Sequence, residues 1–363
     1  MNRSVHDPPV EPVLPTTPRP RRSRKRYVVG AVGAVFAIAT FAYFIPQIAD
    51  YRDVWAVVKG LSWAWLAALA AATVFNLATF APPWQAALPG LSFLSAFVLT
   101  QVSTALSLVV PGGAAVGIAG AYGILRRWGF RGRDIGRGVT LVSIWNQFAN
   151  LSYPVVAVFM LAVEGSSSAV LATAAFIGAA VLGIAVAALG AVLASRRAAA
   201  GIGELAAQLA DWALGKFGRG PVAWGGETFE RFRVEAAHLL RRRWHVLTLA
   251  TYAGTLTVFL VLLVSLRAFD VPASEVTVIE AFAAWALARL LGTIPITPGG
   301  IGVVELSLTA TLVGFGGSNA GVVAAVLVYR FLTMVPTIVV GLAATPYLNR
   351  RARRETVSVK AEH

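Results

Sequence analysis

Three charged side chains lie inside apolar stretches of the sequence. Arg289, Glu305 and Arg330 stand among residues such as leucine, valine and alanine. A charge in such a setting is costly when it lies within a membrane, so these residues are usually paired and functional. One acid against two bases leaves an excess positive charge, which suits a phosphate that arginine binds through parallel hydrogen bonds. The alternative is a structural ion pair, in which Glu305 neutralises one arginine and holds two helices together.

Two Pro-Gly-Gly sequences provide a second candidate binding element. Each ends a long apolar stretch and precedes a short one that contains further glycines. Proline supplies no backbone N–H and glycine no side chain, so a helix broken there exposes backbone dipoles that can bind an ion or an anionic head group. The alternative is a tight turn between two helices. The candidate binding residues from these elements are Pro111, Gly112, Gly113, Pro298, Gly299 and Gly300.

The first Pro-Gly-Gly sequence has no counterpart of Glu305. The next apolar stretch instead carries the polar residues Asn146, Gln147 and Asn150. We interpret Asn146 and Gln147 as candidates that line a head-group cavity. The alternative is that they make hydrogen bonds between helices, as amides in membranes usually do. The polar residues before the first Pro-Gly-Gly sequence are candidates for the same role: Gln101, Ser103, Thr104 and Ser107.

The elements that position these residues are predicted to be transmembrane helices. Hydrophobic residues make up 57% of the 363 residues and charged residues 13%, against about 25% charged residues in soluble domains. This chain has too little polar surface to enclose a soluble core, whereas in a bilayer apolar side chains face lipid. The expected fold class is therefore all-α, as a polytopic bundle of membrane helices.

Apolar stretches of two lengths make up this bundle. The long ones suffice to cross a hydrocarbon core of about 30 Å at about 1.5 Å per residue. The short ones each begin at a Pro-Gly-Gly sequence. Eight stretches are long, at about 27–49, 61–88, 91–110, 138–163, 169–194, 246–268, 277–296 and 319–345, and two are short, at about 112–125 and 299–316.

Basic residues are concentrated in a few connecting segments, which the positive-inside rule places in the cytoplasm. These are segments 126–137 and 195–245, together with the two termini. Acidic or weakly charged connections, such as those around Glu164 and Asp270, are then expected outside. This assignment predicts that both short stretches cross the membrane. It also predicts a multi-pass protein of the plasma membrane with cytoplasmic N- and C-termini.

The sequence divides into two tails and one membrane domain. Residues 1–26 form a proline-rich, basic tail that is expected to be disordered, and residues 346–363 form a second basic tail. Within the membrane domain, 27–345, segment 195–245 repeats apolar and basic residues at helical spacing. This pattern predicts amphipathic helices on the cytoplasmic membrane face. A surface that binds a soluble partner is the alternative.

The two halves of the membrane domain share one order of elements. Each Pro-Gly-Gly sequence is followed by a short glycine-bearing stretch and then by a long helix with an internal proline, Pro154 or Pro336. The charge assignment places the first Pro-Gly-Gly sequence near the outside and the second near the inside. This order predicts an inverted-topology repeat, an arrangement in which transporters place their site where broken helices meet.

Several kinds of chemistry are not expected. The chain has no cysteine, and its four histidines do not stand at ligand spacing from carboxylates. We therefore expect no metal and no cofactor. The net charge of +14 comes from basic segments beside apolar stretches, which indicates membrane orientation, so we expect no nucleic-acid partner.

One family resembles this sequence. The run 294–305, which ends at Glu305, followed by Tyr329, Arg330, Pro336 and Gly341, resembles the flippase-like transmembrane domain of lysylphosphatidylglycerol synthases. The resemblance in organisation covers most of 27–345 and implies the handling of aminoacylated phosphatidylglycerol or another lipid-linked head group. The synthases also carry a soluble aminoacyl-transfer domain. Here only the tail 346–363 follows the last helix, so we do not expect synthase activity of this chain.

Three functions remain open from the sequence. The leading hypothesis is a membrane transporter or flippase that handles an anionic phospholipid or a lipid-linked head group. The second is a polytopic transferase acting on a lipid-linked substrate, with Glu305 as general base. The third is a non-catalytic membrane subunit whose segment 195–245 recruits a soluble partner. We favour a role that is not enzymatic.

Overall fold

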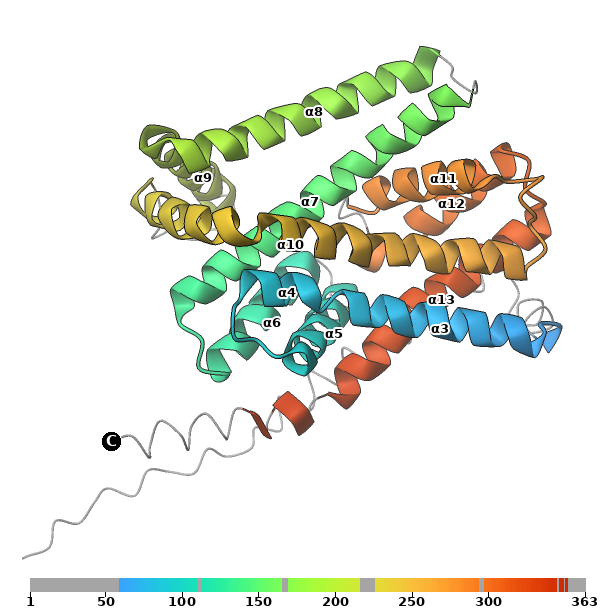
Figure 1. Ribbon diagram of the computed structural model, residues 1–363, viewed down its shortest axis with the longest axis horizontal. Helices are drawn as coiled ribbons and strands as arrows, with labels where there is room; N and C mark the ends of the chain where they lie inside the picture. The colour runs from blue at the N-terminus through green and yellow to red at the C-terminus, as the bar shows by residue number, and fades with distance from the viewer. Residues whose placement is uncertain are drawn as a thin grey trace, which may run out of the picture.

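The protein is described by a computed structural model in which every regular element of the described part is a helix (Figure 1). This confirms the all-α prediction. The tail 1–26 and the predicted helix at 27–49 lie outside the described residues, as does most of the tail 346–363. The described ranges are 59–109, 113–164, 169–215, 226–293, 297–344, 346–348 and 350–351.

Five helical stretches in the described part are long and apolar enough to cross a membrane, which supports a polytopic membrane protein. They are Trp63–Ala87, Gly132–Val163, Phe176–Ala194, Ala236–Ala268 and Asn319–Ala343. The helices that supply them are α3 (Trp63–Thr79), α4 (Pro82–Ala87), α7 (Gly132–Val163), α8 (Ala169–Ala194), α10 (Gly226–Ala268) and α13 (Asn319–Ala343).

The first of these stretches contains a break. Helix α3 ends at Thr79, and α4 begins at Pro82. Two successive prolines, Pro82 and Pro83, have no N–H to donate to the preceding turn, so the helix stops and restarts with proline in its first turn. The structure thus places a break within the predicted stretch 61–88.

The described parts of the insertion predicted at 195–245 are helical, but the part from Gly226 onward is not a separate element. Helix α9 (Arg196–Gly215) stands alone, whereas α10 runs for 43 residues from Gly226 through the predicted membrane stretch 246–268. The two are joined by an ion pair at 2.6 Å between Arg196 and Glu230. The amphipathic segment is therefore continuous with a membrane helix.

Four shorter helices form two antiparallel hairpins. The first hairpin comprises α5 (Phe93–Val109) and α6 (Gly113–Arg127), and the second comprises α11 (Val278–Leu291) and α12 (Val303–Gly314). A 3-10 turn, η1 (Pro298–Gly300), precedes α12. Helix α11 ends at Leu291 rather than at 296. The short stretches predicted to start at Pro-Gly-Gly sequences are thus the returning arms of hairpins.

The loop of the second hairpin packs against the described end of α5 in the first. A side chain on Gly299 would lie 3.1 Å from Cδ2 of Leu108, near the end of α5, and 2.9 Å from Cε of Met334 in α13. The neighbouring helices also exchange partners, because α13 packs along α5 and α7 packs along α11 (Figure 1). One helix of each hairpin therefore packs against the long helix that follows the other hairpin in the sequence.

Those two long helices each contain the predicted proline. Pro154 lies inside α7 and Pro336 inside α13. Close packing of α13 on α5 depends on a small residue, since a side chain on Gly341 would lie 2.9 Å from both the Gln101 carbonyl oxygen and Cβ of Ala105. Small residues at helix crossings are typical of membrane interfaces.

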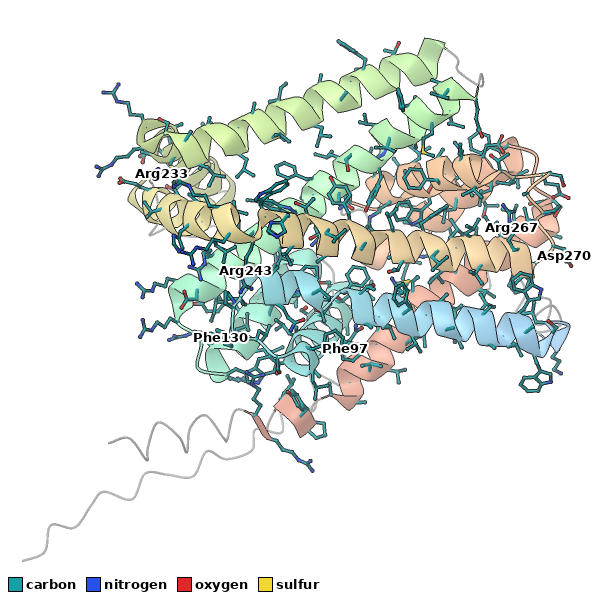
Figure 2. All side chains as sticks on the ribbon, viewed as in Figure 1. Phe97, Phe130, Arg233, Arg243, Arg267 and Asp270 are labelled. Atoms are coloured by element: carbon teal, nitrogen blue, oxygen red, sulfur yellow. The ribbon has the colours of Figure 1, made fainter. Side chains whose placement is uncertain are left out.

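Charged side chains mark the two ends of the bundle. Figure 2 shows Arg233 and Arg243 at the end where α9 meets the start of α10, and Arg267 and Asp270 at the opposite end. The start of α7 lies toward the first of these ends, beside Phe130 (Figure 2). The described parts of segments 126–137 and 195–245 therefore lie toward the same end of the bundle.

Candidate functional site

The tip of the second hairpin is a loop of glycines. Gly299, Gly300 and Gly302 have φ angles of +61°, +67° and +84°. Side chains disfavour these angles, which explains why glycine occupies all three positions. The hydroxyl of Thr297 closes the loop by donating to the Ile301 carbonyl oxygen at 2.8 Å.

The loop is held by an ion pair of the kind that the sequence offered as the alternative, in which Glu305 neutralises one arginine. Nε of Arg330 donates to Oε1 of Glu305 at 2.6 Å, and its Nη2 donates to the Gly299 carbonyl oxygen at 2.9 Å. The second carboxylate oxygen, Oε2, accepts the Gly302 N–H at 2.7 Å at the start of α12. Both oxygens of Glu305 are thus engaged, and the pair connects α13 to the glycine loop.

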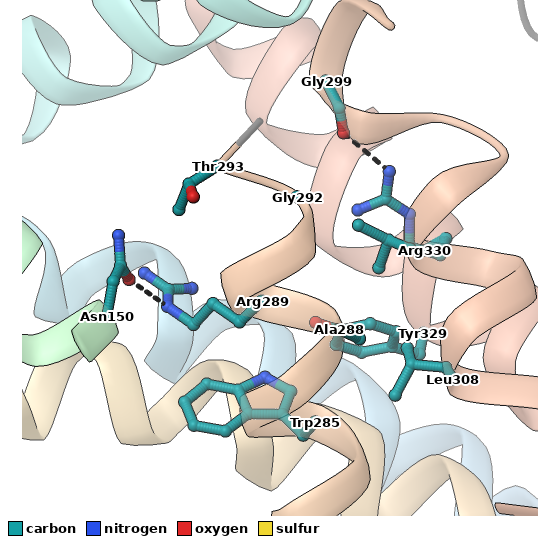
Figure 3. A pocket seen from close by; sticks show the side chains of 11 residues that line it. Asn150, Trp285, Ala288, Arg289, Gly292, Thr293, Gly299, Leu308, Tyr329 and Arg330 are labelled. Atoms are coloured by element: carbon teal, nitrogen blue, oxygen red, sulfur yellow. Dashed lines mark hydrogen bonds between the residues drawn. The ribbon is translucent and has the colours of Figure 1, made fainter. Parts of the chain in front are cut away.

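Arg289 does not belong to this pair. Its Nε donates to Oδ1 of Asn150 in α7 at 2.7 Å, and its guanidinium carbon lies 5.5 Å from the centre of the Trp285 ring (Figure 3). Among the described residues no carboxylate forms an ion pair with Arg289. The excess positive charge predicted from the sequence therefore resides on this one side chain.

A cavity of about 240 Å³ adjoins Arg289 (Figure 3). Helices α7, α11, α12 and α13 and the glycine loop contribute to its wall. We call it the arginine cavity, and its lining residues are Asn150, Trp285, Ala288, Arg289, Gly292, Thr293, Gly299, Val304, Leu308, Tyr329 and Arg330.

A second cavity, of about 640 Å³, lies between the first hairpin and α7. We call it the hydroxyl cavity, because serine and threonine side chains supply much of its polar lining. Gly292 and Thr293, at the end of α11, line both cavities. The polar residues that line the hydroxyl cavity are Thr100, Ser103, Thr104, Ser107, Ser143, Asn146, Gln147, Thr251 and Thr293.

One face of α7 connects the two cavities. Asn146 and Gln147 line the hydroxyl cavity, and Asn150, one turn further along, lines the arginine cavity. Nδ2 of Asn150 donates to Oε1 of Gln147 at 3.2 Å, while Nδ2 of Asn146 donates to the Val142 carbonyl oxygen within its own helix. A polar stripe therefore runs along α7 from one cavity to the other.

The residues predicted as a site fall into three groups. Arg289, Arg330 and Gly299 line the arginine cavity, and Asn146 and Gln147 line the hydroxyl cavity. The second group belongs to the glycine loop or bonds to it. Glu305 accepts the Gly302 N–H, and Pro298 and Gly300 lie in η1. Gly113 belongs to neither cavity lining, and it begins α6 so close to α5 that a side chain there would collide with the Ser107 carbonyl oxygen. Pro111 and Gly112 lie outside the described residues.

Sequence reasoning missed Thr251, Trp285 and Thr293. Thr251 lies on α10, is 2% exposed, and its Oγ1 has no hydrogen-bond partner in the described structure. A lone threonine in an apolar helix carries little signal, because such a hydroxyl usually bonds to its own helix.

The architecture is that of a helical membrane protein in which two helical hairpins pack beside cavities that carry polar side chains. The sequence matches the family described as the Lysylphosphatidylglycerol synthase TM region over residues 28–341. The chain belongs to this family, as the sequence resemblance predicted. A search of curated proteins found no match.

Proposed function

We propose that this protein moves an anionic phospholipid or lipid-linked head group across the plasma membrane. The observation that carries the proposal is Arg289, a partly buried cation without a carboxylate partner in the described part, at a cavity that the glycine loop of the second hairpin helps to line. A phosphate supplies the missing charge and accepts hydrogen bonds from the terminal guanidinium nitrogens.

An inverted repeat is part of this proposal. The first half comprises the stretch at 27–49, α3 with α4, the first hairpin and α7. The second half comprises α8, α10, the second hairpin and α13. The reciprocal packing of α13 on α5 and of α7 on α11 supports a pseudo-symmetric relation between the halves. In transporters built this way, the site lies at the interface of the repeats.

The hairpins also refine the proposed topology. Helix α12 has 12 residues and is about 18 Å long, short of a hydrocarbon core of about 30 Å. We propose that the hairpins enter from opposite faces and meet inside the membrane. A hairpin returns to the face from which it started, so segments 126–137 and 195–245 and both termini remain cytoplasmic, as in the predicted arrangement with ten crossings. Charge alone does not distinguish the two arrangements.

The geometry does not favour a transferase. A general base needs a free carboxylate oxygen near neutral pH, whereas Glu305 is bound by Arg330 and by the Gly302 N–H. The same contacts favour a supporting role for Glu305 at the loop of the second hairpin.

The proposal is tested by lipid translocation in proteoliposomes. Fluorescent phosphatidylglycerol in the inner leaflet is protected from an impermeant quencher until it moves outward. Arg289→Gln removes the charge, and we expect at least about tenfold slower movement because charge-assisted hydrogen bonds are lost. Arg242→Gln, at an exposed position on α10, serves as control and keeps the wild-type rate. Equal rates for Arg289→Gln and wild type would show that the arginine cavity does not carry substrate.

A further inference from the structure

We propose that the transported head group is a phosphate that bears an uncharged, hydroxyl-rich substituent such as glycerol or a sugar, and that it is not an aminoacylated, cationic head group. The arginine cavity binds the phosphate and the hydroxyl cavity binds the substituent. This inference rests on the proposed function and specifies its substrate.

The charge of the residues that line the two cavities disfavours a cationic head group. Neither cavity has a carboxylate in its described lining, and the ionised side chains there are Arg289 and Arg330. The neighbouring sequence positions 110–112 and 294–296 have no ionisable side chain. A lysyl ammonium group would find no counter-charge and would approach a cation without an acid partner, which is unfavourable in a medium of low dielectric constant.

Several hydroxyl groups of the hydroxyl cavity already donate their hydrogens to backbone carbonyl oxygens, which favours a neutral ligand that donates hydrogen bonds. The Thr100 hydroxyl donates to the Ala96 carbonyl oxygen at 2.8 Å. The hydroxyls of Ser103 and Ser107 donate to the backbone carbonyl oxygens of Thr100 and Ser103, at 3.1 and 3.0 Å. Each of these oxygens retains a lone pair. Such a wall accepts hydrogen bonds, so it is suited to a ligand that donates them, and neutral hydroxyl groups do this without a charge penalty.

Thr251 has a buried hydroxyl group that needs a hydrogen-bond partner. Its Oγ1 is buried at the wall of the hydroxyl cavity and has no partner in the described structure. A buried polar atom without a partner is costly, and native structures seldom retain one without a reason. The oxygen itself is covered in this structure, so a ligand hydroxyl becomes its donor and acceptor when the neighbouring side chains move aside.

The sizes of the two cavities, and the residues that line both, also favour a phosphate with a larger substituent. The hydroxyl cavity, at about 640 Å³, is much larger than the arginine cavity, at about 240 Å³. Along α7, Asn150, which bonds to Arg289, faces the arginine cavity, and the neutral amides Asn146 and Gln147 face the hydroxyl cavity. This arrangement matches a compact phosphate joined to a larger neutral group.

The test is competitive lipid binding to the full-length protein in detergent, measured by native mass spectrometry. The lipids have identical acyl chains and are phosphatidylglycerol, phosphatidic acid and lysylphosphatidylglycerol. We expect phosphatidylglycerol to be retained about tenfold more than lysylphosphatidylglycerol, because the latter carries an uncompensated ammonium, and more than phosphatidic acid, which lacks a hydroxyl-bearing substituent. Equal or preferred retention of lysylphosphatidylglycerol would overturn this inference but leave the proposed function in place. If no anionic lipid binds or moves, the proposed function itself fails.

A pair of variants locates the substituent. Thr251→Val removes one hydroxyl at nearly constant volume, and we expect the preference for phosphatidylglycerol over phosphatidic acid to fall about fivefold. Thr73→Val is the matched control, since Thr73 is also buried but its hydroxyl donates to the Leu69 carbonyl oxygen of its own helix. Should Thr251→Val fold poorly, Ser143→Ala in α7 tests the same wall. An unchanged preference in the folded variant would overturn the assignment of the hydroxyl cavity.

Discussion

Nε of Arg289 in the second hairpin donates to Oδ1 of Asn150 in α7 at 2.7 Å. The bond joins a hairpin of the second half to the long helix of the first half. It orients the guanidinium group, which has no carboxylate partner among the described residues, and this is the property that an anion site needs.

Asn150→Asp tests this property directly. The aspartate keeps the hydrogen-bond acceptor but adds a negative charge beside Arg289, so an ion pair replaces the anion site. We expect anionic lipid binding to fall at least about tenfold while the melting temperature stays the same or rises. Asn319→Asp adds the same charge at the exposed start of α13 and is the control. Wild-type binding by Asn150→Asp would contradict an anion at Arg289.

Substitutions in the Glu305–Arg330 pair are expected to change stability and transport activity to different extents. The side chains are 6% and 12% exposed, so removing one partner leaves a buried charge. We expect Glu305→Gln to lower stability by about 3 kcal/mol. Arg330→Lys should also lower activity, because an ammonium does not reproduce the two directed bonds to Glu305 and Gly299.

The double variant Glu305→Leu with Arg330→Leu completes this comparison. It removes both charges, so we expect a partial recovery of the melting temperature. Transport should remain impaired, because the Gly299 carbonyl and the Gly302 N–H have lost the side chains that hold the loop. Full recovery of transport in the double variant would reduce the pair to a simple bridge between helices.

The sequence predicted those residues of the site whose charge is energetically unfavourable in the surrounding apolar sequence. Glu305 and Arg330 stand out because a charge in an apolar stretch requires a partner, and each is the other's partner in the structure. The partner of Arg289 was not predictable in this way. Asn150 lies 139 positions away, and its contact depends on how α7 crosses α11.

Local pattern also failed where tertiary packing sets the outcome. Hydropathy marks an apolar stretch at 277–296 but does not reveal that α11 ends at Leu291 and turns back against α12. Thr251 shows the same limit, since its role arises from a cavity built by other helices. The break at Pro82 was readable from proline chemistry, but overall hydropathy obscured it.

Membrane sidedness provides another prediction. The chain has no native cysteine, so single cysteines report accessibility without background. We expect Asp270→Cys to react with an impermeant maleimide in intact cells, and Arg131→Cys and Arg243→Cys to react only after permeabilisation. Labelling of Arg131→Cys in intact cells would contradict the proposed cytoplasmic location of the start of α7.

The contact between the hairpin tips predicts a lock on transport. Leu108 lies beside Gly299 in the structure, and a substrate that passes between the cavities requires the tips to move relative to each other. We expect Leu108→Cys with Gly299→Cys, joined by a short thiol-reactive cross-linker, to stop translocation while binding of phosphatidylglycerol persists. Each single variant, treated with the same reagent, is the control for strain at the positive φ of Gly299. Reduction of a cleavable cross-linker should restore the rate of the untreated double variant. Translocation at an unchanged rate in the cross-linked protein would mean that substrate does not pass between the tips.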